Sequence, residues 1–391
     1  MTALPSHVRI LSNHSIHGLP GDQIICLKLA NLIPEKQKKL KEILLRNKFS
    51  FKSLDSELFL TGLHSEYANL TVEMSAQQGL VFISNEIAEV LGNFENQTEL
   101  VWKIKGRSLQ LHERTHIMGI LNITPDSFFD GGKYIQTAKA VEHALQMVED
   151  GADIIDVGGE STRPGALPVS EQEEISRVIP VIESIRKQSG VPISIDTQKV
   201  KVAKLAIEAG AEILNDISGL GNDPEIAKLA SDGAGLILMH IKGTPRDMQR
   251  NPSYDNLMEE ILLFLNNSKN KAMEMGVNSD QIVLDPGIGF GKQWFDNYDL
   301  INRLQELQVL NAPILVGASR KSFLNKALSM DPGGKLEGSL VSHVMAVKNG
   351  AHIVRVHDVK ETKKVALVAD LFLERKNLFS LEASKTQEIK L

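Results

Sequence analysis

Short apolar runs alternate with longer amphipathic segments from about residue 115 onward. Each run is too short for a helix and has few polar positions, which is typical of a strand buried on both faces of a parallel sheet. The segments between the runs have helical spacing. In chain order, the eight runs are ILN, DIIDV, ISID, EILND, LILMH, IVLD, ILVG and IVRV.

Glycines mark the ends of the intervening helical segments. Glycine tolerates the left-handed conformation that often follows a helix, so a glycine before each new run supports a repeating unit of helix, glycine and strand. The positions that fit are Gly151, Gly190, Gly210, Gly233, Gly276 and Gly350. Eight such units over about 265 residues predict an α/β fold of the (β/α)8 TIM barrel type. A doubly wound open sheet is the alternative, but its glycine loop after the first strand is missing.

The first hundred residues have a different pattern and predict a small α+β domain, with a ferredoxin-like arrangement as our interpretation. We expect strands at 24–29, 57–60, 70–74 and 80–84 and helices at 34–47 and 85–94. Residues 100–104 and 108–111 predict a hairpin around Lys105-Gly106-Arg107. The expected parts are therefore an extension of unknown role (1–98), a barrel with its leading hairpin (99–376) and a C-terminal tail (377–391).

Composition restricts the possible functions. Of 391 residues, 42% are hydrophobic, which is enough for a large core, while a net charge of −6 argues against a nucleic-acid-binding surface. The one cysteine, Cys26, cannot form an internal disulfide, and no apolar run approaches the roughly 18 residues of a membrane span. The N-terminus lacks a charged-then-apolar signal pattern, so we expect a cytoplasmic location.

Every predicted barrel strand ends in a polar residue. In such barrels the carboxyl ends of the strands form one face, which carries the active site. The end residues are Asn122, Asp156, Asp196, Asn215, His240, Asp285, Ser319 and Arg355. After the first of them comes a loop, ITPDSFFDGG, with carboxylates and a glycine end. The sequence therefore predicts a polar site that contains both acidic and basic side chains.

The motifs around these strand ends occur in a characteristic order. They are NITPDSFFDGG, DVGGESTRPGA, SIDTQK, LNDISG, MHIKGTPRDMQ, LDPGIGFGK, GASRKSF and RVHDV. Together, over residues 115–369, they resemble those of the dihydropteroate synthase family. That resemblance implies a transferase of folate biosynthesis, the target of sulfonamides, which joins 6-hydroxymethyl-7,8-dihydropterin diphosphate to p-aminobenzoate and releases diphosphate. It also implies Mg²⁺ as cofactor and a homodimer as assembly.

The resemblance assigns roles around the pterin. Asp285 matches the carboxylate that accepts two donors from the pterin edge, and Asn215 matches a second edge contact. Asp196, Lys321 and Arg355 match catalytic positions, with the negative charge of Asp196 facing positive charge that develops as diphosphate leaves. The remaining slot residues implied are Met239, Phe290 and Gly317.

The same resemblance implies an anion site and a second subsite. Arg163, Arg355 and His357 match the diphosphate site, with Thr162 and Asn122 as neutral partners. Asn122 and Asp130 match the residues that help to hold Mg²⁺, which tolerates few protein ligands. The p-aminobenzoate subsite is implied at Phe128, Pro164, Lys321 and Ser322. One departure is Phe129, which stands where the family usually has a small residue and leaves the sulfonamide response open.

Two other functions remain as alternatives. A pterin-dependent methyltransferase module linked to a corrinoid partner would share the barrel but would not need Arg163, Phe128, or Lys321 with Ser322. A pterin-binding protein without catalysis would share the pterin residues. The glycine run GIGFG lacks the lysine and hydroxyl of a phosphate-binding loop, so we interpret it as a place of close backbone packing.

Overall fold

The computed structural model describes residues 8–15, 23–95, 100–123, 133–163, 165–328 and 335–373. The chain divides into two compact units, which we call the N-terminal unit and the barrel unit. The N-terminal unit comprises Met1–Thr98 together with Arg303–Asn311. The barrel unit comprises Glu99–Asn302 and Ala312–Leu391.

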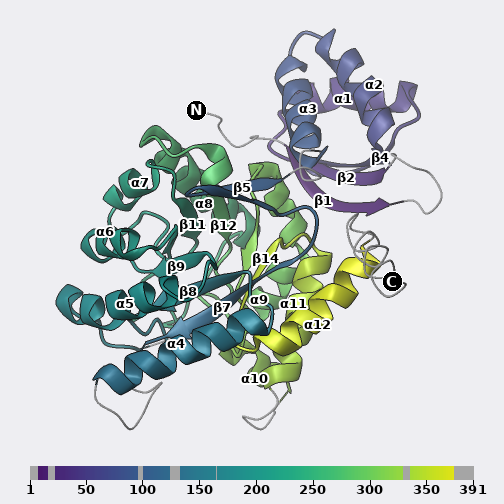
Figure 1. The fold of residues 1–391 in the computed structure, drawn as a ribbon. Helices are drawn as coiled ribbons and strands as arrows, with labels where there is room; N and C mark the ends of the chain where they lie inside the picture. Colours follow the sequence, from purple (N-terminus) through teal and green to yellow (C-terminus); the bar gives the residue numbers. More distant parts are fainter. Residues whose placement is uncertain are drawn as a thin grey trace, which may run out of the picture. The chain divides into compact units, whose positions relative to one another are not determined.

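The N-terminal unit is a four-stranded antiparallel sheet with three helices (Figure 1). Its strands are β1 (Val8–Ser15), β2 (Gln23–Leu29), β3 (Ser50–Leu54) and β4 (Glu57–Leu63), in the order β1-β2-β4-β3. Its helices are α1 (Pro34–Arg46), α2 (His64–Ser75) and α3 (Val81–Glu95). The expected ferredoxin-like arrangement is wrong, because it needs parallel neighbours from β-α-β crossovers and every strand pair here is antiparallel.

Two predicted strands of this unit are helical. Residues 70–74 lie in α2, where Tyr67, Leu70 and Met74 are buried at helical spacing. Most of residues 80–84 lie in α3, where Ile83, Ile87 and other apolar residues line one buried face. A short apolar run does not by itself distinguish a strand from a buried helical face, and packing decided between them here.

A separate chain segment completes the N-terminal unit. This 3-10 helix, η4 (Leu304–Leu310), lies in the sequence between two barrel elements. The side-chain amide of Asn93 in α3 donates a hydrogen bond to the carbonyl of Val309 (3.0 Å). Leu304, Leu307 and Leu310 are buried. The N-terminal unit therefore depends on residues far beyond its own stretch of sequence.

The barrel unit contains all eight predicted strands, in parallel, with helices around their outside (Figure 1). The strands are β7 (His116–Asn122), β8 (Ile154–Gly158), β9 (Ile193–Asp196), β10 (Ile213–Asp216), β11 (Gly235–Met239), β12 (Ile282–Asp285), β13 (Leu315–Val316) and β14 (Ile353–Val356). The helices are α4 (Lys133–Glu149), α5 (Glu171–Arg186), α6 (Val200–Ala209), α7 (Glu225–Ala230), α8 (Leu257–Glu274), α9 (Trp294–Asn302), α10 (Ser322–Leu328), α11 (Lys335–Lys348) and α12 (Val359–Phe372).

Closure of the barrel occurs between β12 and the start of β13. The other strands pair in sequence order through β14 to β7, and a parallel bridge joins Leu284 to Ile314. The amide of Leu284 also donates to the carbonyl of Pro313 (2.9 Å). The predicted (β/α)8 barrel is thus confirmed, and the open-sheet alternative is wrong.

The predicted glycine caps are confirmed at five of six positions. Gly151, Gly210, Gly233, Gly276 and Gly350 have φ values between 97° and 114°. At Gly190 the prediction is wrong. Helix α5 ends at Arg186 with Lys187 as its C-cap, and Lys187 has right-handed backbone angles, so the chain turns before it reaches the glycine.

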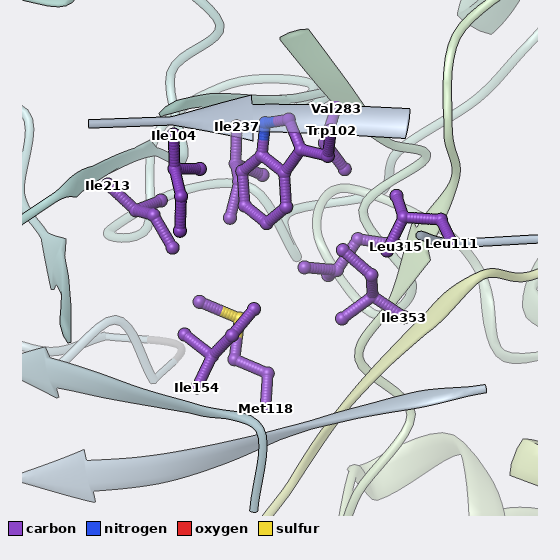
Figure 2. Packing of buried hydrophobic residues seen from close by; sticks show 10 residues of the cluster. All are labelled: Trp102, Ile104, Leu111, Met118, Ile154, Ile213, Ile237, Val283, Leu315 and Ile353. Carbon is purple, nitrogen blue, oxygen red and sulfur yellow. The ribbon is translucent and has the colours of Figure 1, made fainter. Parts of the chain in front are cut away.

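A hairpin closes the amino-terminal end of the barrel. Strands β5 (Val101–Ile104) and β6 (Arg107–Gln110) pair around a two-residue turn, as predicted. Trp102 is fully buried, and its indole nitrogen donates to the carbonyl of Gln281 (2.8 Å), in the short helix η3 (Ser279–Gln281). Figure 2 shows the indole among apolar side chains of the strands: Met118, Ile154, Ile213, Ile237, Val283, Leu315 and Ile353. The polar strand ends are left at the opposite end.

Candidate active site

A buried ion network joins three barrel strands. Arg355 in β14 contacts Asp156 of β8 through Nε (2.6 Å) and Asp196 of β9 through Nη2 (2.6 Å). Asn215 of β10 donates from Nδ2 to the same oxygen of Asp156 (3.1 Å). Asp156 is fully buried, and its Oδ1 has no hydrogen-bond partner in the described part of the chain. Oδ1 of Asp156 can therefore still accept a hydrogen bond, close to the guanidinium of Arg355.

Burial and charge act in opposite directions on this network. Burial raises the pKa of Asp196 to about 7; Arg355 opposes that rise, and the carboxylate of Asp156 adds to it. Burial disfavours the charge on Arg355, but Asp156 and Asp196 outweigh it and raise the pKa of the guanidinium further. The arginine therefore remains a cation while Asp196 can exchange a proton near neutral pH.

A second charged pair lies at the end of β12. Burial raises the pKa of Asp285, and the cation of Lys321 opposes this rise. Burial lowers the pKa of Lys321 to about 7, against the attraction of Asp285. The ammonium group of Lys321 donates to the carbonyl of Ile288 and lies 4.4 Å above the centre of the Phe290 ring. Lys321 thus lies over an aromatic face and within the electrostatic influence of the Asp285 carboxylate.

The glycine run after β12 packs closely against its neighbours, as interpreted from the sequence. Gly287, Gly289 and Gly291 all have positive φ. A Cβ atom on Gly287 would lie 1.9 Å from the carbonyl oxygen of His240, and one on Gly291 would lie 2.3 Å from that of Lys242. Only glycine fits such approaches, because any side chain would meet rigid backbone.

The buried side chain of Lys292 forms hydrogen bonds with the backbone of this glycine run. It is buried, and its ammonium group donates to Nδ1 of His240 (2.9 Å) and to the carbonyls of Gly287 (2.9 Å) and Phe290 (3.1 Å). Burial lowers the pKa of Lys292 to about 7, against the attraction of Asp285. Sequence analysis missed this role, because lysine is rarely buried and its partner His240 is distant in the sequence.

Apolar side chains form one wall near these charges. Met239 and Phe290 are buried together with Ile217 and Met248, and Ile241 packs against them. The predicted slot residues Met239 and Phe290 therefore lie in one cluster. Gly317 lies beside Arg355, since a Cβ atom on Gly317 would be 3.7 Å from Cβ of the arginine, which is an ordinary van der Waals contact.

His357, one of the predicted anion-binding residues, is held by the loop after β13 and lies within the electrostatic influence of two others, Arg355 and Arg163. Ser319 Oγ accepts a hydrogen bond from the amide of His357 (3.1 Å) and lies 2.9 Å from its Nδ1. Burial, together with the positive charges of Arg355, Arg320 and Arg163, lowers the pKa of His357 to about 4, against the opposing effect of Asp358. Arg163 is exposed, yet it acts on His357 across the site. This side of the site is therefore electropositive.

The residues predicted for the metal and the p-aminobenzoate subsite are only partly within the described chain. Phe128, Asp130 and Pro164 lie outside the described residues. Asn122 ends β7, with its Oδ1 3.5 Å from where a Cβ on Gly158 would be, and Ser322 is exposed at the start of α10. Across the described ranges, no three His, Cys, Asp or Glu side chains form a group that could hold a metal ion, and no helix is long and apolar enough to cross a membrane.

Comparison with known proteins shows that the barrel is similar in sequence to pterin-binding enzymes. The profile of the family described as pterin binding enzymes matches residues 118–357. The dihydropteroate synthase of Clostridium beijerinckii is 47% identical over 275 residues, covering 70% of this chain and all of that protein. The enzyme of the same name from Bacillus subtilis is 46% identical over 281 residues, covering 72% of this chain and 96% of that protein.

Solved structures give the same result. A Yersinia pestis dihydropteroate synthase, solved as a sulfonamide drug complex, has a TM-score of 0.66 and 42% identity, covering 70% of this chain and 99% of that one. The Xanthomonas albilineans enzyme has a TM-score of 0.66 and 39% identity, covering 71% and 99%. With this barrel, these strand-end motifs and relatives matched over nearly their whole length, the chain belongs to the dihydropteroate synthases, within the pterin-binding enzyme family.

Proposed function

We propose that the strand ends divide the dihydropteroate synthase reaction among a pterin slot, an anion site and a p-aminobenzoate subsite. The observation that carries this division is the double contact of Arg355 with Asp156 and Asp196, next to the pair of Asp285 and Lys321. Support also comes from the Xanthomonas albilineans enzyme, which was solved with 4-aminobenzoic acid and, separately, with 7,8-dihydropteroate.

The pterin would lie between the apolar wall and the carboxylates. Asp285 has one oxygen engaged by the amide of Gly287 (2.7 Å) and the other left for the N–H groups of the pterin edge. Asn215 offers its amide oxygen, since its Nδ2 already donates to Asp156. Met239 and Phe290 would cover one face of the ring, and Lys321 would bring a positive charge to its edge.

The chemistry would take place beside Arg355. The bond between the pterin methylene carbon and the diphosphate oxygen breaks, the amine nitrogen of p-aminobenzoate bonds to that carbon, and the nitrogen then loses a proton. Asp196 in its ionised form stabilises the positive charge on the pterin, while Arg355 stabilises the departing anion. Lys321, with Ser322, Phe128 and Pro164, would border the p-aminobenzoate subsite.

The leaving group would be held by Arg163, Arg355 and His357, with Thr162 as a neutral donor. Arginine suits this task because its planar fork matches phosphate oxygens. The side-chain oxygen of Asn122 at the end of β7 is a hard donor of the kind that Mg²⁺ prefers, and Asp130 is the second proposed ligand. The bound ion would neutralise part of the diphosphate charge.

A homodimer through the barrel helices is also proposed. Helices α11 and α12 pack together and carry exposed apolar side chains: Val341 (64%), Val368 (52%), Leu371 (47%) and Phe372 (86%). Apolar patches of this kind are more often covered than left in water. Sedimentation analysis should give a dimer that Val368→Glu converts to a monomer, and a monomeric wild-type protein at micromolar concentration would contradict this assembly.

The test of the proposed site is an assay of dihydropteroate and diphosphate formation in Mg²⁺, combined with calorimetry of pterin binding. We expect turnover in the wild type, and Asp285→Asn should weaken pterin binding roughly tenfold or more, because it removes about 1.5 to 3 kcal/mol of charge-assisted bonding. Asp280→Asn is the matched control, since Asp280 pairs with Lys103 at the other end of the barrel. Equal pterin affinity in Asp285→Asn and wild type would place the pterin edge elsewhere.

A further inference from the structure

Two of the site motifs each carry a charged residue that the reaction does not use. Glu160 belongs to DVGGESTRPGA, the loop after β8 that also holds Thr162 and Arg163. Lys199 ends SIDTQK, after β9, where it is the N-cap residue of α6. Neither residue belongs to the pterin slot or to the anion site described above.

Lys199 joins these loops to a third element. Its ammonium group lies 2.6 Å from Oε2 of Glu160 and 2.5 Å from Oε2 of Glu174 in α5. Glu174 is fully buried, while Lys199 and Glu160 have side chains that are 19% and 21% exposed. Burial opposes the charge on Lys199, but the hydrogen bonds to Glu160 and Glu174 outweigh it and raise the pKa of the ammonium group. Lys199 is therefore a permanent cation between two carboxylates.

Glu160 closes the stem of the loop that carries Arg163. Its second oxygen, Oε1, accepts a hydrogen bond from the amide of Val169 (3.0 Å), near the other end of the loop. At the start of the loop, the carbonyl of Gly159 accepts a hydrogen bond from Arg177 (2.7 Å) of α5. A Cβ atom on Gly159 would lie 2.8 Å from Val178 and 2.9 Å from Glu174, so the stem lies directly on α5.

The backbone of Arg163 is held within its own loop, where its carbonyl accepts a hydrogen bond from the amide of Ala166 (3.0 Å) and the nearby Gly165 donates to the carbonyl of Pro245 (3.3 Å), whereas its side chain makes no hydrogen bond or ion pair with the described part of the chain. It is exposed, and its known influence within the site is the charge effect on His357. A long, exposed side chain reaches its partner productively only if the backbone that carries it is fixed, and small misplacements are costly in catalysis. Besides these tip contacts, the position of Arg163 depends on the stem, which Lys199 holds through Glu160.

We propose that Lys199 is a positioning residue for the diphosphate half of the reaction. Its ammonium group ties the stem of the Arg163 loop to β9 and α5, so that Arg163 meets the leaving group from a fixed backbone. This inference rests on the role proposed for Arg163 and adds a residue that acts through it without contact with substrate.

The test is a double-mutant cycle between Lys199→Met and Arg163→Ala in the full chain, with KM for the pterin diphosphate and kcat measured separately. Lys199→Met should raise KM about tenfold and change kcat less, and Lys199→Arg should recover most of the loss. In the Arg163→Ala background, Lys199→Met should add little, because the group that it positions is gone. Lys228→Met is the matched control, since Lys228 forms an exposed ion pair with Glu225.

Glu160→Gln provides a second route if Lys199→Met leaves Glu174 unpaired and fails to fold, because it weakens the contact with the loop and retains the pair of Lys199 and Glu174. It should reproduce the rise in KM. Independent, additive effects of the Lys199 and Arg163 substitutions would overturn the positioning role while the proposed function stands. An Arg163→Ala variant with wild-type KM would overturn both the role of Arg163 and the inference built on it, and wild-type turnover reports on the reaction separately.

Discussion

At neutral pH Asp196, Lys321 and Lys292 all lie close to the midpoints of their titrations, and the first two are proposed to face the substrates. Burial raises the pKa of Asp196 to about 7 and lowers that of Lys321 to about 7. The two shifts have the same cause, since burial disfavours whichever form is charged. Both residues were predicted from their motifs, but their titration near pH 7 depends on burial and neighbouring charges that only the fold supplies.

The titrations of Asp196 and Lys321 predict a bell-shaped dependence of kcat/KM on pH. In the proposed mechanism the active form has Asp196 ionised and Lys321 protonated, so activity should be lost as pH falls below about 7 through protonation of Asp196 and as it rises above about 7 through deprotonation of Lys321. Asp196→Asn should remove the acid limb and lower the maximum, and Lys321→Arg should remove the alkaline limb, because arginine remains charged.

The measurement is a profile of initial rates from about pH 5.5 to 9 at constant ionic strength. Each apparent pKa belongs to the interacting set and not to one residue alone, so the assignment comes from the variants. Persistence of both limbs in both variants would show that ionisation of the substrate sets the profile.

At the scale of elements, the barrel strands and most glycine caps could be predicted, because short apolar runs and the glycines between helix and strand are local sequence signals. All eight apolar runs became strands, and the hairpin at Trp102 was predicted from its two strands and its glycine turn. Residues 70–74 could not be placed in a helix from their short apolar run, since only packing distinguished the two structures. The contact of Lys292 with His240 joins residues 52 positions apart and left no local signal.

The glycine run after β12 gives a prediction at this scale. Gly287→Ala should destabilise the protein by more than the about 1 to 2 kcal/mol that a left-handed alanine costs by itself, because its Cβ would also meet the carbonyl oxygen of His240. Gly233→Ala measures the backbone cost alone, since Gly233 has φ of 104° and no atom lies within 4 Å of the position that its Cβ would take.

Denaturant titration of both variants gives the comparison. The excess loss in Gly287→Ala should be accompanied by weaker pterin binding, because the same backbone supplies the amide that holds Asp285. Equal losses of stability in the two variants would show that the glycine run moves freely away from His240.

At the scale of the whole molecule, the chain contains a complete synthase barrel and an additional N-terminal unit. Every motif of the site follows residue 114. The sequence indicated the additional unit but not that η4 belongs to it. Helix η4 follows the rest of the unit by about 200 residues, and its sequence has no pattern that assigns it there. The unit therefore cannot be removed as one continuous segment.

A truncated protein that starts at Glu99 should retain its chemistry and lose stability. Its kcat should stay within about threefold of the full chain, since the strand ends are intact, but Leu304, Leu307 and Leu310 would lose the partners that bury them. Thermal unfolding should therefore begin at a lower temperature, with more aggregation. A folded truncation without activity would show that the N-terminal unit takes part in catalysis.

Arg355, held by Asp156 and Asp196, is proposed to stabilise the departing diphosphate. The most direct measurement is the single-turnover rate of diphosphate release by Arg355→Lys, with saturating substrates and Mg²⁺. Lysine retains the charge but cannot contact both carboxylates through a planar fork, so the rate should fall about 100- to 1,000-fold while pterin affinity and the circular dichroism spectrum stay close to wild type. A rate within a factor of about three of wild type would contradict the account, since the leaving group would then be stabilised elsewhere.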